Sequence, residues 1–262
     1  MKIRVLASII AFALASSAGF LTWFGQRENV SAAKSEPTAN IVEKAQVAAN
    51  FGNIPLHFEQ NNGQPSGPVK FLARGAGYTL FLTSHEAVLQ LRNASARRAS
   101  ANPHSAIQTP HLLRMRFAGA TESAEVTGED ELAGKTNYFI GNDPTNWRAN
   151  ISNFARVRYH EIYPGVDVVY YGNQQQLEYD FVISPAADPR GIALEFNGAQ
   201  KIKVDAQGEL ILRTKGGEVR QQKPKVYQEI AGERRTIAGR YVVKGKNRMG
   251  LQWRNMTAPV RS

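Results

Sequence analysis

Two carboxylates in one predicted strand have the spacing that acid–base chemistry could use. In residues 177–181 (LEYDF), Glu178 and Asp180 alternate with apolar residues. Neighbouring residues of an extended chain point to opposite faces, so both carboxylates lie on one face of this strand. Two carboxylates at such a short distance raise each other's pKa. They could also bind calcium together with Asp167 or Asp143. The alternative without a ligand is pairing with Arg or Lys on a neighbouring strand.

Tyrosines crowd the same part of the sequence: Tyr159, Tyr163, Tyr170, Tyr171 and Tyr179. Exposed aromatic rings bind sugars, but the core of a β-sandwich also uses tyrosines. The candidate ligand-facing residues are therefore Glu178, Asp180, Tyr170 and Tyr171. A glycan-active hydrolase would need two carboxylates converging in a cleft, about 5–9.5 Å apart. A binding module would instead carry an exposed aromatic or basic patch without such a pair.

Other motif searches assign no catalytic, metal or cofactor-binding residue. The chain has no cysteine, which excludes a disulfide framework, a thiolate metal site and a cysteine nucleophile. Residues 128–136 resemble a phosphate-binding loop, but Glu129 stands where that loop needs its first glycine. The five histidines show no short metal-ligand spacing, and no nucleophile elbow is present. We therefore expect no cofactor and no enzymatic activity.

The N-terminus has the layout of an export signal. Lys2 and Arg4 precede an apolar run over residues 5–24. A helix of this length spans about 30 Å, the thickness of a bilayer's hydrocarbon core. Two interpretations remain open: a signal peptide cut at residues 16–18 or 31–33, or an uncut membrane anchor. Both place the N-terminal segment at a membrane and the rest of the chain in the periplasm, on the cell surface or in the medium.

The remaining sequence predicts an all-β domain. From residue 51 onward, short alternating segments are bounded by Gly, Pro, Asn and Asp, without intervening helices. This pattern favours an antiparallel β-sandwich-like domain after an N-terminal hydrophobic helix, and the polar loop over residues 92–110 could divide it into two lobes. We expect Trp147 to be buried in the core. The predicted organisation is signal or anchor (1–24), linker (25–43), β-rich domain (44–253) and irregular tail (254–262).

Positive charge is concentrated in the C-terminal quarter. Residues 201–262 hold 15 Lys and Arg against 5 Asp and Glu, so the first 200 residues are neutral in a chain of net charge +10. A basic face could bind an envelope polysaccharide or another anionic surface, or could be a solvated sheet face. No nucleic-acid-binding motif is present. Charges at the last predicted hairpin would repel a second copy, so we expect a monomer at low salt.

Several segments resemble the uncharacterised domain at the N-terminus of bacterial SBBP-type β-propeller repeat proteins. The matching segments lie within residues 44–245 and are FGNIPLHFEQNNGQ, VKFLARGAGYTLFLT, NYFIGNDPTNW, ARVRYHEIYPGVDVVYYGNQQQLEYDFVISPAADP and KPKVYQE. The resemblance implies an exported β-rich module without an assigned activity or site. In that family a closing strand and propeller repeats follow, whereas residues 254–262 here contain neither. We expect a non-catalytic module for binding or presentation; the alternatives are a glycan-active hydrolase and a structural stub of a larger propeller protein.

Export is testable with residues 1–40 fused to a reporter that is active only outside the cytoplasm. The positive start followed by an apolar run predicts an active reporter. Mass spectrometry of the mature N-terminus then separates cleavage from anchoring. Reporter protein retained in the cytoplasm would contradict the prediction.

Overall fold

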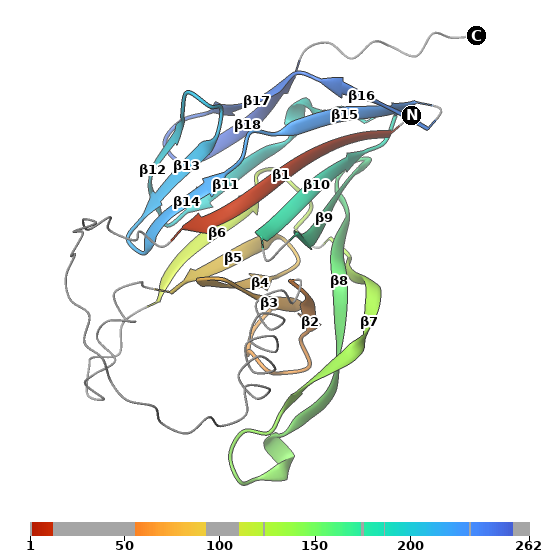
Figure 1. Ribbon diagram of the computed structural model, residues 1–262, viewed down its shortest axis with the longest axis vertical. Coiled ribbons are helices and arrows are strands. Elements are labelled where there is room, and N and C mark those ends of the chain that lie inside the picture. Colours follow the sequence, from red (N-terminus) through yellow and green to blue (C-terminus); the bar gives the residue numbers. More distant parts are fainter. Residues whose placement is uncertain are drawn as a thin grey trace, which may run out of the picture.

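The protein is described by a computed structural model over residues 2–12, 56–92, 110–122, 124–173, 176–185, 187–230 and 232–253 (Figure 1). These residues form one continuous antiparallel sheet of 18 strands, which confirms the all-β class. The strands are β1 (Lys2–Phe12), β2 (Phe58–Gln60), β3 (Phe71–Gly75), β4 (Tyr78–Leu82), β5 (Glu86–Leu91), β6 (His111–Phe117), β7 (Val126–Tyr138), β8 (Arg148–Tyr163), β9 (Val166–Asn173), β10 (Gln176–Ile183), β11 (Ala193–Asn197), β12 (Ala199–Val204), β13 (Leu210–Thr214), β14 (Gly217–Gln221), β15 (Lys225–Ile230), β16 (Glu233–Ile237), β17 (Gly239–Val243) and β18 (Arg248–Trp253). Two short 3-10 helices, η2 (Pro144–Asn146) and η3 (Pro189–Gly191), lie between strands.

The sheet curls around a single core. Strands β2 to β6 pair in sequence order, β6 then pairs with β11, and β11 pairs with β18. In the other direction β2 pairs with β8, and β8, β9 and β10 follow as neighbours. Strand β1 lies between β10 on one side and β14 and β15 on the other. Apolar residues from nearly all of these strands meet in one cluster, as in a sandwich.

Aromatic rings from three neighbouring strands form the centre of that core. The rings of Tyr159 on β8 and Tyr170 on β9 have centroids 5.7 Å apart, and Tyr170 and Tyr179 on β10 are 5.6 Å apart. Phe181 continues the series, 5.8 Å from Tyr179. All four side chains are essentially buried. Alternation places them on the inner face of their strands, so one sheet face supplies a continuous aromatic layer.

The β7–β8 hairpin leaves the body of the molecule. Figure 1 shows its distal half, in green, extending away from the other strands and ending at η2. The N-terminal residues of β8 are largely exposed, whereas its C-terminal half is part of the core. Pairing between β7 and β8 shifts register between Glu131 and Lys135. The buried Asn153 side chain bonds that bulge, donating to the Gly134 carbonyl at 2.9 Å and accepting from the Thr136 hydroxyl at 3.0 Å.

Glycines with positive φ form the turns between several strands. The hairpin formed by β3 and β4 turns at Gly77, whose φ is +89°. Gly165, which follows Pro164, has a φ of +70°, the positive value that the third residue of a type II turn requires. The polar loop does not separate two lobes, because β5 and β6 on either side of it pair directly. Residues 93–109, the linker over residues 25–43 and the tail over residues 254–262 lie outside the described residues.

The expected N-terminal hydrophobic helix is not seen over Lys2–Phe12, which form strand β1 instead. An apolar run fits a buried strand as well as a helix, and here strands on both sides supply backbone partners. Residues 13–24 lie outside the described residues. In the part of the chain that the structure describes, no helix has the length and apolar character needed to cross a membrane.

Two glycines with positive φ differ in whether an added Cβ would have room. Gly198, between β11 and β12, has a φ of +96°, and a Cβ there would overlap the Leu112 carbonyl oxygen. Gly232 has a φ of +84° with no atom within 4 Å of a Cβ. In a denaturant titration, Gly232→Ala should lower the free energy of unfolding by about 1–2 kcal/mol, because alanine is strained at positive φ. Gly198→Ala adds overpacking and should cost about 2–5 kcal/mol; equal losses would contradict the close approach.

Candidate functional site

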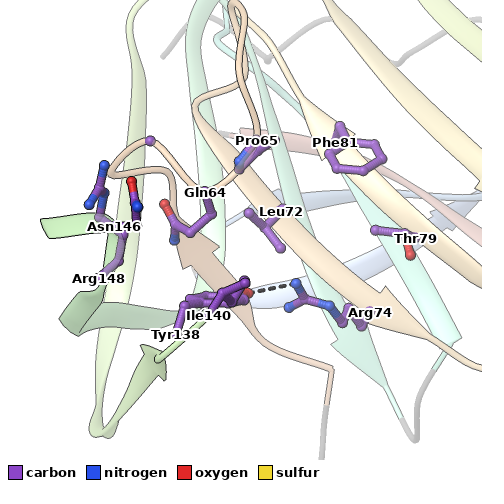
Figure 2. A pocket seen from close by; sticks show the side chains of 11 residues that line it. Gln64, Pro65, Leu72, Arg74, Thr79, Phe81, Tyr138, Ile140, Asn146 and Arg148 are labelled. Atoms are coloured by element: carbon purple, nitrogen blue, oxygen red, sulfur yellow. Dashed lines mark hydrogen bonds between the residues drawn. The ribbon is translucent and has the colours of Figure 1, made fainter. Parts of the chain in front are cut away.

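A pocket of about 460 Å³ lies between the sheet body and the end of the β7–β8 hairpin (Figure 2). One wall comes from β3 and β4 and includes Arg74 and Phe81. The opposite wall comes from the hairpin and includes Tyr138, Asn146 and Arg148, and the loop after β2 contributes Gln64. Two guanidinium groups, two amides and aromatic rings therefore line one concave site, and none of its lining residues is Asp or Glu.

The two walls are joined through a buried carboxylate. Glu59 on β2 is 4% exposed, and its carboxylate accepts hydrogen bonds from the guanidinium of Arg74 and the hydroxyl of Tyr138. Arg74 also donates to the Tyr138 hydroxyl at 2.6 Å, and its guanidinium lies 5.5 Å from the centre of that ring. Burial and the nearby Glu59 carboxylate raise the pKa of Tyr138, so its hydroxyl remains a donor. This network fixes Arg74 in the pocket wall.

Arg148 gives the pocket its uncompensated positive charge. Its guanidinium donates to the carbonyl oxygens of Thr145 at 3.1 Å and Trp147 at 3.0 Å, at the end of the hairpin. Within the described ranges, no carboxylate lies at ion-pair distance from Arg148. The charge of Arg74 is balanced by Glu59, so the pocket is cationic because of Arg148.

Large apolar side chains are exposed beside the pocket. Phe139 is 63% exposed, Ile140 69% and Trp147 39%. The rings of Phe139 and Trp147 pack edge to face, with centroids 5.2 Å apart. Exposed aromatic rings next to fixed polar groups are typical of sites that recognise a ligand through stacking.

The prediction that Trp147 is buried in the core was wrong. Its indole N–H is paired, donating to the Gly141 carbonyl oxygen at 3.2 Å, but the residue is 39% exposed and lies outside the core cluster. The reason is that the β7–β8 hairpin extends beyond the sheet body, so no second layer covers its end (Figure 1). A strand pattern alone does not tell whether another layer covers it.

Glu178 and Asp180 lie elsewhere, on the outer face of β10. They are 7% and 5% exposed, and the Tyr171 hydroxyl donates to Asp180 at 3.1 Å. Burial raises the pKa of Asp180 to about 6, while the charges of Arg4 on β1 and Arg156 on β8 act to lower it. The two carboxylates share a face as predicted, but neither lines the pocket. For Asp180, the two arginines act in the direction that the alternative without a ligand expects, but burial has the larger effect.

Tyr170 does not face a ligand. It is fully buried in the aromatic layer of the core, on the opposite face of β9 from Tyr171. Adjacent residues of a strand cannot share a face, so only Tyr171 joins Glu178 and Asp180. Within the described residues, no group of three or more His, Cys, Asp or Glu side chains could hold a metal ion.

The pocket residues Arg74, Tyr138 and Arg148 were not predicted from the sequence. Part of the signal was present in the segment NYFIGNDPTNW, where Tyr138, Phe139 and Trp147 flank a run of turn residues. Aromatic residues gathered at a hairpin end are typical of an exposed site rather than of a core. The contribution of Arg74, from a distant hairpin, has no local signal.

An exposed ring predicts a small stability effect. Trp147→Ala should lower the free energy of unfolding by about 1–2 kcal/mol, because the side chain loses its packing on Phe139 and its hydrogen bond to Gly141 but lies outside the core. Phe181→Ala, the matched core substitution, should cost about 3–5 kcal/mol. Urea titrations of both variants measure the difference. A loss of about 3–5 kcal/mol for Trp147→Ala, as expected for a core residue, would contradict its place outside the core.

The raised pKa of Asp180 predicts a pH dependence of stability. A carboxyl whose folded-state pKa is about 6, above the unfolded value of about 3.9, binds its proton more tightly in the folded state. The free energy of unfolding should therefore fall as the pH rises from about 4 to about 6. Asp180→Asn should remove this fall and gain up to about 3 kcal/mol at neutral pH.

Urea titrations between about pH 4.5 and pH 7 measure the effect of Asp180. Asp188→Asn is the control: hydrogen bonds from Arg190 lower the pKa of Asp188 to about 2, so it is ionised in both states over this range. If wild type and Asp180→Asn had the same pH dependence, the carboxyl would not titrate as its burial predicts.

Comparison with known proteins places the chain in a family without naming an activity. No curated protein and no solved structure matches the sequence significantly. The family model described as "Domain of unknown function (DUF7948)" matches residues 58–259, which include the pocket and the outer face of β10. The chain belongs to this DUF7948 family of uncharacterised domains.

Proposed function

We propose that this protein is an exported, non-catalytic β module that binds an acidic polysaccharide in the pocket beside the β7–β8 hairpin. The observation that carries the proposal is the position of Arg148. Its guanidinium has no carboxylate partner among the described residues, and it lies in a concave site beside exposed aromatic rings.

The lining matches the chemistry of an acidic sugar. A planar guanidinium binds a carboxylate through two parallel hydrogen bonds, which favours uronic acids over neutral sugars. The side-chain amides of Gln64 and Asn146 are suited to hydroxyl groups, and the rings of Phe81 and Tyr138 in the lining are suited to the apolar faces of sugar rings. The pocket is partly open, so a chain longer than one sugar could extend out of it.

A glycan-active hydrolase is less well supported. Such an enzyme needs two carboxylates flanking the scissile bond. The pocket lining contains none, and Glu178 and Asp180 are nearly buried on a different part of the sheet. A purely structural stub would need no cationic pocket with exposed rings, so the pocket favours a binding role.

Export is proposed from the sequence. Lys2 and Arg4 before an apolar run are typical of an export signal, and the absence of cysteine is compatible with a bacterial envelope. The resemblance to the domain that precedes SBBP-type propeller repeats supports an envelope location and a role in presentation. A polysaccharide of the envelope is the acidic ligand that such a location would offer.

Binding can be measured by calorimetry with a hexamer of polygalacturonic acid. Arg148→Ala should weaken binding at least about tenfold, because a charge-assisted pair contributes more than 1.4 kcal/mol. Arg240→Ala is the matched control: it removes one exposed arginine, bonded to Gln252 on β18, away from the pocket. A neutral maltohexaose should not bind. Equal losses in the two variants would indicate nonspecific attraction to net charge and would overturn the proposed site.

A further inference from the structure

Strand β1 lies between two strand edges, β10 on one side and β14 with β15 on the other, and pairs with both. We call the space that it occupies the slot. Residues 3–9 of β1 pair with residues 183–177 of β10. On the other side, residues 2–6 pair with residues 229–225 of β15, and residues 9–12 pair with residues 221–218 of β14. All of these pairings are antiparallel. In the part of the chain that the structure describes, β1 is the only strand that joins β10 to β14 and β15; Figure 1 shows it, in red, between them.

The same residues belong to the proposed export signal. A segment that is held in a membrane as a helix, or removed by cleavage, cannot pair with β10 at the same time. Without β1, two strand edges face each other across the width of one strand, with unpaired backbone N–H and C=O groups on both. This step rests on the export part of the proposed function and not on the polysaccharide pocket.

The register defines what kind of segment fits. Positions 3, 5, 7 and 9 of β1 are apolar and pair with four buried residues of β10: Ile183, Phe181, Tyr179 and Leu177. The intervening positions lie on the face of Glu178 and Asp180. Arg4 pairs with Val182, and its positive charge stabilises the ionised carboxylate of Asp180. The slot thus selects an extended segment with alternate apolar residues and a basic residue opposite Val182.

We propose that the slot between β10 and the β14–β15 edge is a strand-acceptor site for a partner polypeptide. The partner supplies an extended segment, apolar at alternate positions and basic opposite Val182, and it takes the place of β1 when the N-terminal segment is withdrawn during export. Main-chain hydrogen bonds to both edges provide affinity, and the core positions and the acidic face provide specificity. The strand-acceptor site lies apart from the pocket, because β10, β14 and β15 contribute none of the residues that line the pocket.

The test uses the full chain with Val5→Pro, which removes a backbone donor from the middle of β1 and expels it from the sheet. The probe is a fluorescent peptide with the sequence of residues 2–12, KIRVLASIIAF. Anisotropy should report binding to the Val5→Pro chain, and the peptide should raise the melting temperature of that chain. The wild-type chain and Val5→Thr, which keeps the backbone donor, should not bind, because their slot is filled.

Two altered peptides test the chemistry of the site. A peptide with Pro in place of Val5 should not bind. A peptide that carries the substitution Arg4→Glu should bind at least tenfold more weakly, because it brings a third carboxylate to the face of Glu178 and Asp180. Equal binding of the Arg4→Glu peptide and the unaltered peptide would overturn the proposed partner chemistry. If Val5→Pro does not fold alone, refolding with and without the peptide gives the same answer, and no effect of the peptide in either assay overturns the proposal.

Two further outcomes identify other occupants. The native chain has no cysteine, so a disulfide between an Arg4→Cys chain and a Val182→Cys chain, mixed under oxidation, would assign the slot to a second copy and overturn the partner. If the exported protein were recovered with residues 2–12 still attached and paired, the slot would belong permanently to β1. This result would also overturn the proposal of a partner polypeptide. Failure of the polygalacturonate assay would leave the peptide result unchanged, so the two proposals fail separately.

Discussion

The backbone pairing of β8 is the constraint on which both the core and the pocket depend. Along its C-terminal half, β8 pairs with β9 on one side and β7 on the other. At Asn153 and Phe154 the partner on the first side changes from β9 to β2, while β7 continues on the second. A single strand therefore closes the curled sheet and then carries the hairpin outward. The buried Asn153 side chain, bonded to the bulge of β7, stabilises this point of change.

Alternation and turn residues made the fold class predictable. The period-2 segments, the turn at Gly165 and the pairing of the last two strands follow from local sequence, because strand faces and turn geometry are local properties. The N-terminal run did not follow, because an apolar segment satisfies either a helix or a buried strand, and only the facing edges of β10 and β15 favour the strand.

The candidate site was less predictable because its partners are far apart in the sequence. Tyr138 and Glu59 are separated by 79 residues, and Arg74 comes from a third element. Glu178 and Asp180 were predicted because their spacing is local, yet their face is covered, and arginines from β1 and β8 act on it. Electrostatic balance decides which group is available to a ligand: Arg74 is compensated by Glu59, whereas Arg148 is bonded only to carbonyl oxygens in the described residues.

The two-stranded form of the outer β7–β8 hairpin has a mechanical consequence. One wall of the pocket belongs to the sheet body and the other to a ribbon with few buried apolar contacts, which bends more easily than a packed sheet. The hydrogen bonds between Tyr138, Glu59 and Arg74 tie the outer end of this ribbon to the sheet body. The width of the pocket therefore depends on these hydrogen bonds, because the ribbon has little core of its own to hold it in place.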